Sequence, residues 1–186
     1  MGRITINLLE KEVEEFKVQE NNSYLNSYQE FIKYFDNISR IEKHHLIISA
    51  HFIYGWMPTI INLRLQNLEE VLRILNKVKA KNILKVSELQ ELKHCINNSL
   101  VGVSKLLHFI NPEIYPIWDS KIYRFWSGKK TIYGIQDPQN YLLFLKEMHL
   151  IANNENFQPV KKKVESQLKY EVSGVRALEL IIFQKV

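Results

Sequence analysis

The feature that most constrains the fold is the helical spacing of apolar residues, which recurs along almost the whole chain between short polar or proline-containing breaks. Segment 68–80 shows it most clearly, with apolar side chains three, four and seven positions apart at Leu68, Val71, Leu72, Leu75 and Val78. Breaks such as Asn111-Pro112 and Asp137-Pro138 mark the ends and starts of helices. The pattern predicts an all-α fold, a compact multi-helix domain of about nine helices.

The 186 residues, of which 46% are hydrophobic, suffice for a single domain with one core. We expect N-terminal helices in residues 1–60, and further helices with the candidate active site in residues 61–186. Cys95 is the single cysteine and lies in an apolar helical pattern, which predicts a buried thiol, no internal disulfide and a cytoplasmic location. No apolar run reaches the roughly 18 residues of a membrane span, so no membrane partner is expected.

The positive charge of the chain is uneven. The formal net charge is +5, and residues 100–186 hold 12 Lys and Arg against 8 Asp and Glu. Such an excess suits a polyanionic partner, although a solvated basic surface explains it equally well. Four basic side chains, which we expect to contact phosphates, follow residue 119 closely: Lys121, Arg124, Lys129 and Lys130.

Segment 102–125 carries the clearest chemical pattern. Asp119 follows Pro-Ile-Trp and stands before a helix expected over residues 120–126, where its carboxylate can cap the first amides. The positive end of the helix dipole favours a negative charge at that place. Upstream, Ser104 is expected to cap a short apolar helix over residues 105–110 that opens with Lys105. A plain helix cap, worth about 1 kcal/mol, is the alternative role for Asp119.

These residues resemble the helix-hairpin-helix DNA glycosylase superfamily, which includes endonuclease III, the MutY adenine glycosylases and the 8-oxoguanine glycosylases. Residues 100–104, Leu-Val-Gly-Val-Ser, are similar to a reduced form of the family's hairpin, and residues 116–122 are similar to its capped aspartate element. The resemblance implies that Gly102, Val103 and Ser104 bind DNA, that Asp119 is the catalytic aspartate and that Lys105 stands where bifunctional members keep a Schiff-base lysine. No cysteine cluster follows, so no iron–sulfur cluster or other cofactor is expected.

The function expected from this resemblance is a DNA glycosylase that releases a damaged or modified base from double-stranded DNA, in repair or in defence against phage DNA. Such an enzyme flips the nucleotide out of the helix, and a carboxylate such as Asp119 stabilises the positive charge that develops on the sugar. Lys105 is a candidate nucleophile at C1′, which would add AP lyase activity; otherwise water attacks and the enzyme is monofunctional. We expect a monomer in which Lys105 and Asp119 share a cleft.

Four side chains are candidates for the base pocket: Tyr54, Trp56, His108 and Trp118. Aromatic residues at helical spacing are more often core, so one or two of five aromatic side chains are expected to line a pocket, namely Tyr54, Trp56, Trp118, Tyr123 and Trp126. A satisfied, partly buried histidine is the more common situation for a residue such as His108.

Two other functional classes remain open. Arg40 and His45, which are separated by four residues, resemble the Arg-x4–6-His motif of HEPN ribonucleases. On the single helix expected over residues 40–56, however, the two side chains would point about 140° apart. An inactive helix-hairpin-helix protein that only binds DNA is the third possibility. A metal site at His44, His45 and His51 is not expected, because no carboxylate stands at ligand spacing on the same face.

Overall fold

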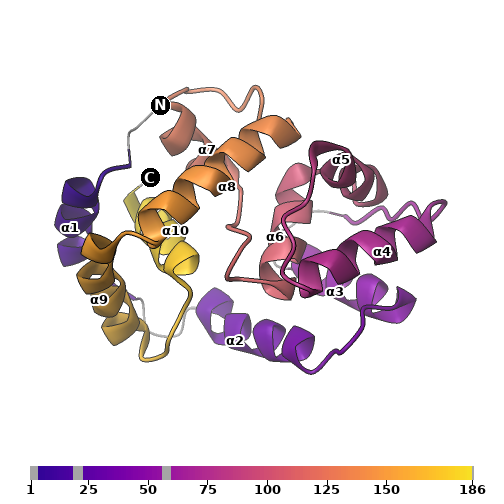
Figure 1. Ribbon diagram of the computed structural model, residues 1–186, viewed down its shortest axis with the longest axis horizontal. Coiled ribbons are helices and arrows are strands. Elements are labelled where there is room, and N and C mark those ends of the chain that lie inside the picture. The colour runs from indigo at the N-terminus through magenta and orange to yellow at the C-terminus, as the bar shows by residue number, and fades with distance from the viewer. Residues whose placement is uncertain (1–3, 19–22, 56–59, 186) are drawn as a thin grey trace. The chain divides into compact units, whose positions relative to one another are not determined.

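The computed structural model describes residues 4–18, 23–55 and 60–185 (Figure 1). These ranges contain ten α-helices, one short 3-10 helix and no β-strand, which confirms the all-α prediction. None of the helices in the described ranges combines the length and the apolar character needed to cross a bilayer. Cys95 is buried, and burial raises the pKa of its thiol to about 11, as expected for a structural rather than a reactive cysteine.

The chain divides into two compact units. The inserted unit comprises residues 21–111, and the terminal unit joins residues 1–20 to residues 112–186. The N-terminal helix therefore belongs with the C-terminal helices, an association between distant parts of the sequence that helical periodicity does not reveal.

The inserted unit is built around one helix that is apolar on all sides. Its elements are α2 (Ser23–Asp36), α3 (Lys43–Gly55), α4 (Leu68–Lys79), α5 (Val86–Cys95) and α6 (Leu100–Ile110). Helix α6 contacts each of the other four (Figure 1). Among its residues only Val101 and Lys105 are not fully buried. A helix with apolar residues on every face is stable in water only when its neighbours cover it, so α6 organises this unit.

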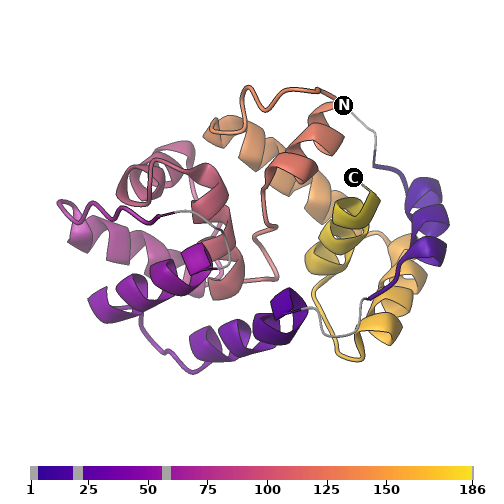
Figure 2. The ribbon, with the colours of Figure 1, turned by 180° about the vertical axis from the view of Figure 1, so that it is seen from behind.

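The terminal unit is likewise built around one buried helix, α10 (Gly174–Lys185). Its elements are α1 (Ile6–Glu15), α7 (Ser120–Ser127), α8 (Pro138–Ala152), a 3-10 helix η1 (Glu155–Phe157), α9 (Gln158–Leu168) and α10 (Gly174–Lys185). Helix α10 contacts α1, α7, α8 and α9 (Figure 2). Its residues from Val175 to Ile182 are buried. Two of these buried residues, Arg176 and Glu179, are charged, which marks the place where this core departs from simple apolar packing.

The turn before α6 lies earlier than the hairpin predicted from the sequence. Helix α5 ends at Cys95, and Asn97 and Asn98 adopt positive φ angles of 51° and 52°, which asparagine tolerates better than most residues. The Ser99 hydroxyl then accepts a hydrogen bond from the Gly102 amide (3.2 Å) and caps α6. The turn therefore occupies residues 96–99, and the expected hairpin at residues 100–104 is wrong.

Gly102, Val103 and Ser104 are consequently helical, and Lys105 lies in the middle of α6 rather than at its start. One glycine in an apolar run costs a helix only about 1 kcal/mol, and burial of α6 outweighs that cost. The prediction misplaced the helix start because it weighted Gly102 as a break and Ser104, rather than Ser99, as the cap.

Candidate functional site

The segment of residues 112–119, which begins with a turn at residues 112–114, is held in place by side chains of the terminal unit. His149 Nε2 donates to the Ile114 carbonyl (2.8 Å) and Tyr141 Oη donates to the Pro116 carbonyl (2.9 Å). At the start of the segment, the Ser173 hydroxyl donates to the Pro112 carbonyl (2.7 Å). Buried backbone groups need such partners, and here α8 and the start of α10 provide them.

Asp119 ends this segment and caps α7, as predicted. Its backbone is extended, and its Oδ1 accepts a hydrogen bond from the Ile122 amide at 2.8 Å. The side chain is half-buried, and its second oxygen accepts no hydrogen bond from any residue that the structure describes. One carboxylate oxygen thus fixes the orientation of the group, while the other remains available to a ligand.

A buried ion pair underlies the segment two residues before Asp119. The carboxylate of Glu179 pairs with the guanidinium of Arg176 one turn earlier on α10, and its Oε2 accepts a hydrogen bond from the Ile117 amide (2.9 Å). Burial raises the pKa of Glu179 to about 7, because Arg176 and the Ile117 amide offset the loss of solvation only in part, and the nearby Asp119 adds to the rise. Asp119 therefore has a second carboxyl group close by, in a drier environment.

Trp118 is a core residue rather than an exposed wall of a base pocket. It is 0% exposed, and its indole Nε1 donates to the carbonyl of Ile135 at 2.9 Å. Its ring packs against a cluster of aromatic side chains: Tyr123, Trp126, Tyr141 and Phe144. The base-pocket prediction for Trp118 is not supported, because these contacts cover the whole ring.

The predicted phosphate-binding side chains of the terminal unit are exposed. Lys121 and Arg124 lie on α7, where the ammonium of Lys121 is 4.7 Å from the centre of the Phe183 ring. Lys129 and Lys130 follow in the loop after α7, which begins at Gly128 in a left-handed conformation (φ 69°). The basic side chains and Asp119 therefore belong to one structural unit.

The other predicted site residues belong to the inserted unit. Lys105 is half-buried on α6, so it and Asp119 lie in different units, and no pairing of the two follows from either unit alone. His108 is fully buried, and its Nε2 lies 2.9 Å from Tyr28 Oη, which is the satisfied histidine considered as the alternative. Trp56 lies outside the described residues.

Tyr54 explains why position 102 is a glycine. A Cβ on Gly102 would stand 2.5 Å from Tyr54 Oη and 3.1 Å from two of its ring carbons. Tyr54 is 4% exposed, and its hydroxyl makes no hydrogen bond of normal geometry to the described residues. Burial raises the pKa of Tyr54, and the Ser99 hydroxyl offsets part of that rise. Gly102 therefore permits close packing of α3 on α6.

The start of α3 differs from the single helix expected over residues 40–56. The side chain of Asn76 accepts from the Ile41 amide (2.8 Å) and donates to the Ile41 carbonyl (2.9 Å), so it holds Ile41 outside the helix. Helix α3 begins only at Lys43, and Arg40 is not helical. Arg40 and His45 therefore do not share a helix, and the angle of about 140° expected between them does not apply.

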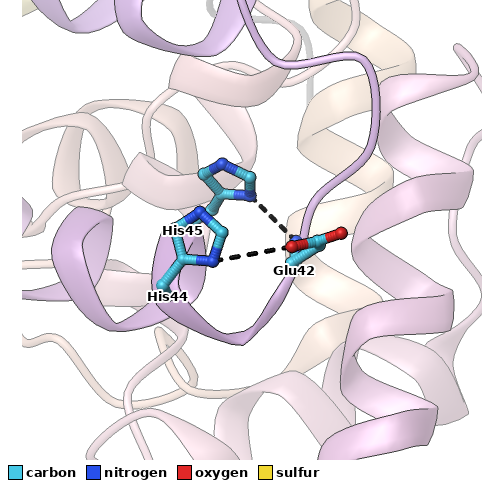
Figure 3. Close-up of side chains that lie close together, drawn as sticks. All are labelled: Glu42, His44 and His45. Carbon is cyan, nitrogen blue, oxygen red and sulfur yellow. Dashed lines mark hydrogen bonds and ion pairs between the residues drawn. The ribbon is translucent and has the colours of Figure 1, made fainter.

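Because α3 starts late, the carboxylate of Glu42 lies close to His44 and His45, whereas the sequence predicted no carboxylate near these histidines. One ligand atom each from Glu42, His44 and His45 lies within 4.8 Å of the others, and Figure 3 shows both imidazoles turned towards Glu42. His44 Nδ1 is 3.6 Å from Glu42 Oε2, whereas His45 Nδ1 accepts a hydrogen bond from the Glu42 amide (3.0 Å). A metal bound at His45 Nδ1 would have to displace that hydrogen bond, because the nitrogen has one lone pair.

Several side chains that position Asp119 were not singled out from the sequence, namely Tyr141, His149, Arg176 and Glu179. A signal for the last two was present, since Arg176 and Glu179 interrupt an otherwise apolar helix one turn apart. Comparison with protein-family models, with curated proteins and with solved structures gave no significant match.

Proposed function

We propose that this protein is a DNA glycosylase that releases a damaged or modified base, with Asp119 stabilising the positive charge on the sugar. The observation that carries the proposal is the fixation of Asp119, whose Oδ1 caps α7 while the preceding residues are tied to the surrounding helices. Electrostatic stabilisation works best when the charged group is already in place before the reaction begins.

The two carboxyl groups near the end of the segment suit different tasks. Burial raises the pKa of Glu179, which is paired with Arg176 and contacts the Ile117 backbone rather than solvent. Asp119 is half-buried at the positive end of a helix and has an oxygen available. Pairs of neighbouring carboxyl groups in which one is buried and the other is partly solvated are common at acid–base sites. Asp119 is then the residue that acts on the sugar, and Glu179 is a positioning residue.

The charge of the terminal unit supports double-stranded DNA as the partner. Lys121, Arg124, Lys129 and Lys130 are exposed within a short stretch after Asp119. Contacts of this kind to phosphates fix the register of a protein on DNA and do not depend on base sequence. We expect the protein to act as a cytoplasmic monomer.

Lys105 remains a candidate nucleophile within this proposal. It is half-buried among the apolar residues of α6, and its primary amine is the kind of group that can attack C1′ and form an imine. Base release by Asp119 with water does not depend on it, so the proposal rests on Asp119.

The direct test is a panel of duplexes that carry damaged or modified bases, assayed for abasic sites with and without alkali. Alkali-dependent cleavage indicates a monofunctional glycosylase, and cleavage without alkali indicates lyase activity. If the protein binds these duplexes but creates no abasic site in any of them, the DNA-binding alternative replaces the enzyme.

The HEPN-like ribonuclease alternative predicts a different result. It places the chemistry at Arg40 and His45, and the imidazole of His45 has a pKa that burial and the neighbouring His44 lower. RNA cleavage that is lost in both Arg40→Ala and His45→Ala, with no base release from DNA, would establish the ribonuclease instead. On the glycosylase account, His45→Ala retains base release and the protein does not cut single-stranded RNA.

A further inference from the structure

The loop between α7 and α8 has a well-defined backbone. The Ile135 amide donates to the Ile132 carbonyl (3.0 Å), and the Asp137 amide donates to the Gly134 carbonyl (3.1 Å). Gly134 has a φ of 94°, and a Cβ there would stand 2.8 Å from Tyr123 Oη, so both conformation and space require glycine. These two turns define the path of residues 132–137.

Side chains of α7 and α8 donate hydrogen bonds to the backbone of this loop. Tyr123 Oη donates to the Tyr133 carbonyl, and Asn140 Nδ2 donates to the Gly134 carbonyl (2.9 Å). The next residue, Ile135, accepts the indole hydrogen bond of Trp118, the residue directly before Asp119. The loop is thereby connected to the segment that positions the proposed catalytic carboxylate.

The braced backbone directs a large aromatic side chain into solvent. Tyr133 is 85% exposed, although its own carbonyl is held by a buried tyrosine. Its neighbours Lys129, Lys130 and Ile132 are exposed as well. An exposed aromatic ring on a fixed backbone loses little conformational freedom on binding, because it has only two side-chain torsions.

We infer that Tyr133 stacks on a DNA base beside the flipped nucleotide, with Lys129 and Lys130 on the flanking phosphates. The inference rests on the proposed DNA partner and extends the proposed function by naming the base contact. An aromatic ring offers stacking to any base, and the two lysines provide charge complementarity to the backbone. Aromatic and basic side chains combined on one surface are the usual means of holding unstacked bases.

The test is binding to a duplex that contains a tetrahydrofuran abasic analogue with 2-aminopurine as the neighbouring base, and the affinity is measured by fluorescence anisotropy. We expect Tyr133→Ala to weaken binding by about 5- to 150-fold, since stacking on one base is worth that much. Tyr133→Trp should retain tight binding. The control Leu150→Ala removes another exposed apolar side chain of the same unit, about 18 Å along α8 from its first residue, and should bind as the wild type does.

The salt dependence distinguishes stacking from a loss of charge contacts. Lys129→Gln with Lys130→Gln should reduce the slope of log K against log salt by about 1.8, whereas Tyr133→Ala should leave the slope unchanged and alter 2-aminopurine fluorescence in the complex. Wild-type affinity in Tyr133→Ala would overturn the inference, even if base release is observed. Weakened binding in Tyr133→Ala without any base release would sustain the inference and remove the proposed catalysis.

Discussion

The carboxylate of Glu179 accepts a hydrogen bond from the backbone amide of Ile117 at 2.9 Å, inside the core of the terminal unit. Ile117 lies two residues before Asp119, so a buried charged group on α10 controls the backbone that presents the proposed catalytic carboxylate. Arg176 shares the same carboxylate. Burying such a pair is costly, and it persists where it fixes a geometry that apolar packing would leave loose.

The pKa of Glu179 predicts how the stability of the fold depends on pH. The carboxyl titrates near its ordinary value of 4.5 in the unfolded chain and at about 7 in the folded one, because burial disfavours the charge. Between these two pH values the unfolded chain binds fewer protons than the folded chain does. The stability that protonation of Glu179 contributes below pH 4.5 is therefore lost as the pH rises to about 7.

Glu179→Gln isolates this effect because glutamine does not titrate. We expect the free energy of unfolding of the wild type, relative to that of Glu179→Gln, to fall between about pH 4.5 and about pH 7, by an amount on the order of 1–3 kcal/mol. Urea unfolding at several pH values measures both proteins. A difference that is flat across this range contradicts the account.

The contact between Gly102 and Tyr54 predicts a coupled pair of substitutions. Gly102→Ala should destabilise the protein by about 1–3 kcal/mol, because its Cβ would overlap Tyr54 Oη. Tyr54→Phe alone should cost little, and it should relieve part of the penalty, since the oxygen is the closest atom and the ring carbons at 3.1 Å remain. A double-mutant cycle by chemical unfolding measures the coupling, and additive effects would show that the two residues do not meet.

Two neighbouring asparagines test the position of the turn before α6. Both have positive φ, but among the described residues only the side chain of Asn97 forms hydrogen bonds: it donates to the Ile60 carbonyl (2.8 Å) and accepts from the Asn62 amide. Asn98→Gly should therefore stabilise the protein by up to about 1 kcal/mol, since glycine adopts this conformation without strain. Asn97→Gly should be destabilising, because it removes two hydrogen bonds. Thermal unfolding compares the pair, and destabilisation by Asn98→Gly would place the turn elsewhere.

The role of Lys105 can be separated from that of Asp119 by trapping. If Lys105 attacks C1′, borohydride reduces the imine and links the protein covalently to DNA, and Lys105→Ala abolishes this adduct because only an amine forms it. Lys105→Arg is the matched control, since it keeps the charge but not the nucleophile. A wild type that releases bases without any trapped adduct is monofunctional, and an adduct that persists in Lys105→Ala assigns the nucleophile to another amine.

Local patterns predicted the fold class and the cap at Asp119 because both depend on residues close together in the sequence. Helical periodicity and the Asp119 cap involve neighbours within a turn or two, and the structure confirms them. The late start of α3 depends instead on Asn76, which holds Ile41 from 35 positions away, and no local pattern contains that contact.

The environment of Asp119 was less predictable for the same reason. Trp118 looked suitable for a base pocket as an isolated aromatic, but its hydrogen-bond partner Ile135 and the packed ring of Phe144 come from beyond the helix that follows it. Glu179 approaches Ile117 across 62 positions, so its role emerges only when the chain is folded. Two-unit organisation, with residues 1–20 joined to the C-terminal part, is likewise a tertiary property.

The rate of base release by Asp119→Asn tests the central claim most directly. Asparagine still caps a helix, so the fold and melting temperature should remain close to those of the wild type, whereas Asp119→Ala should lose about 1 kcal/mol of stability. Under single-turnover conditions, on whichever modified duplex the wild type processes, we predict that Asp119→Asn forms abasic sites at least about 100-fold more slowly. Wild-type rates in a folded Asp119→Asn protein would contradict the assignment of Asp119 as the catalytic carboxylate.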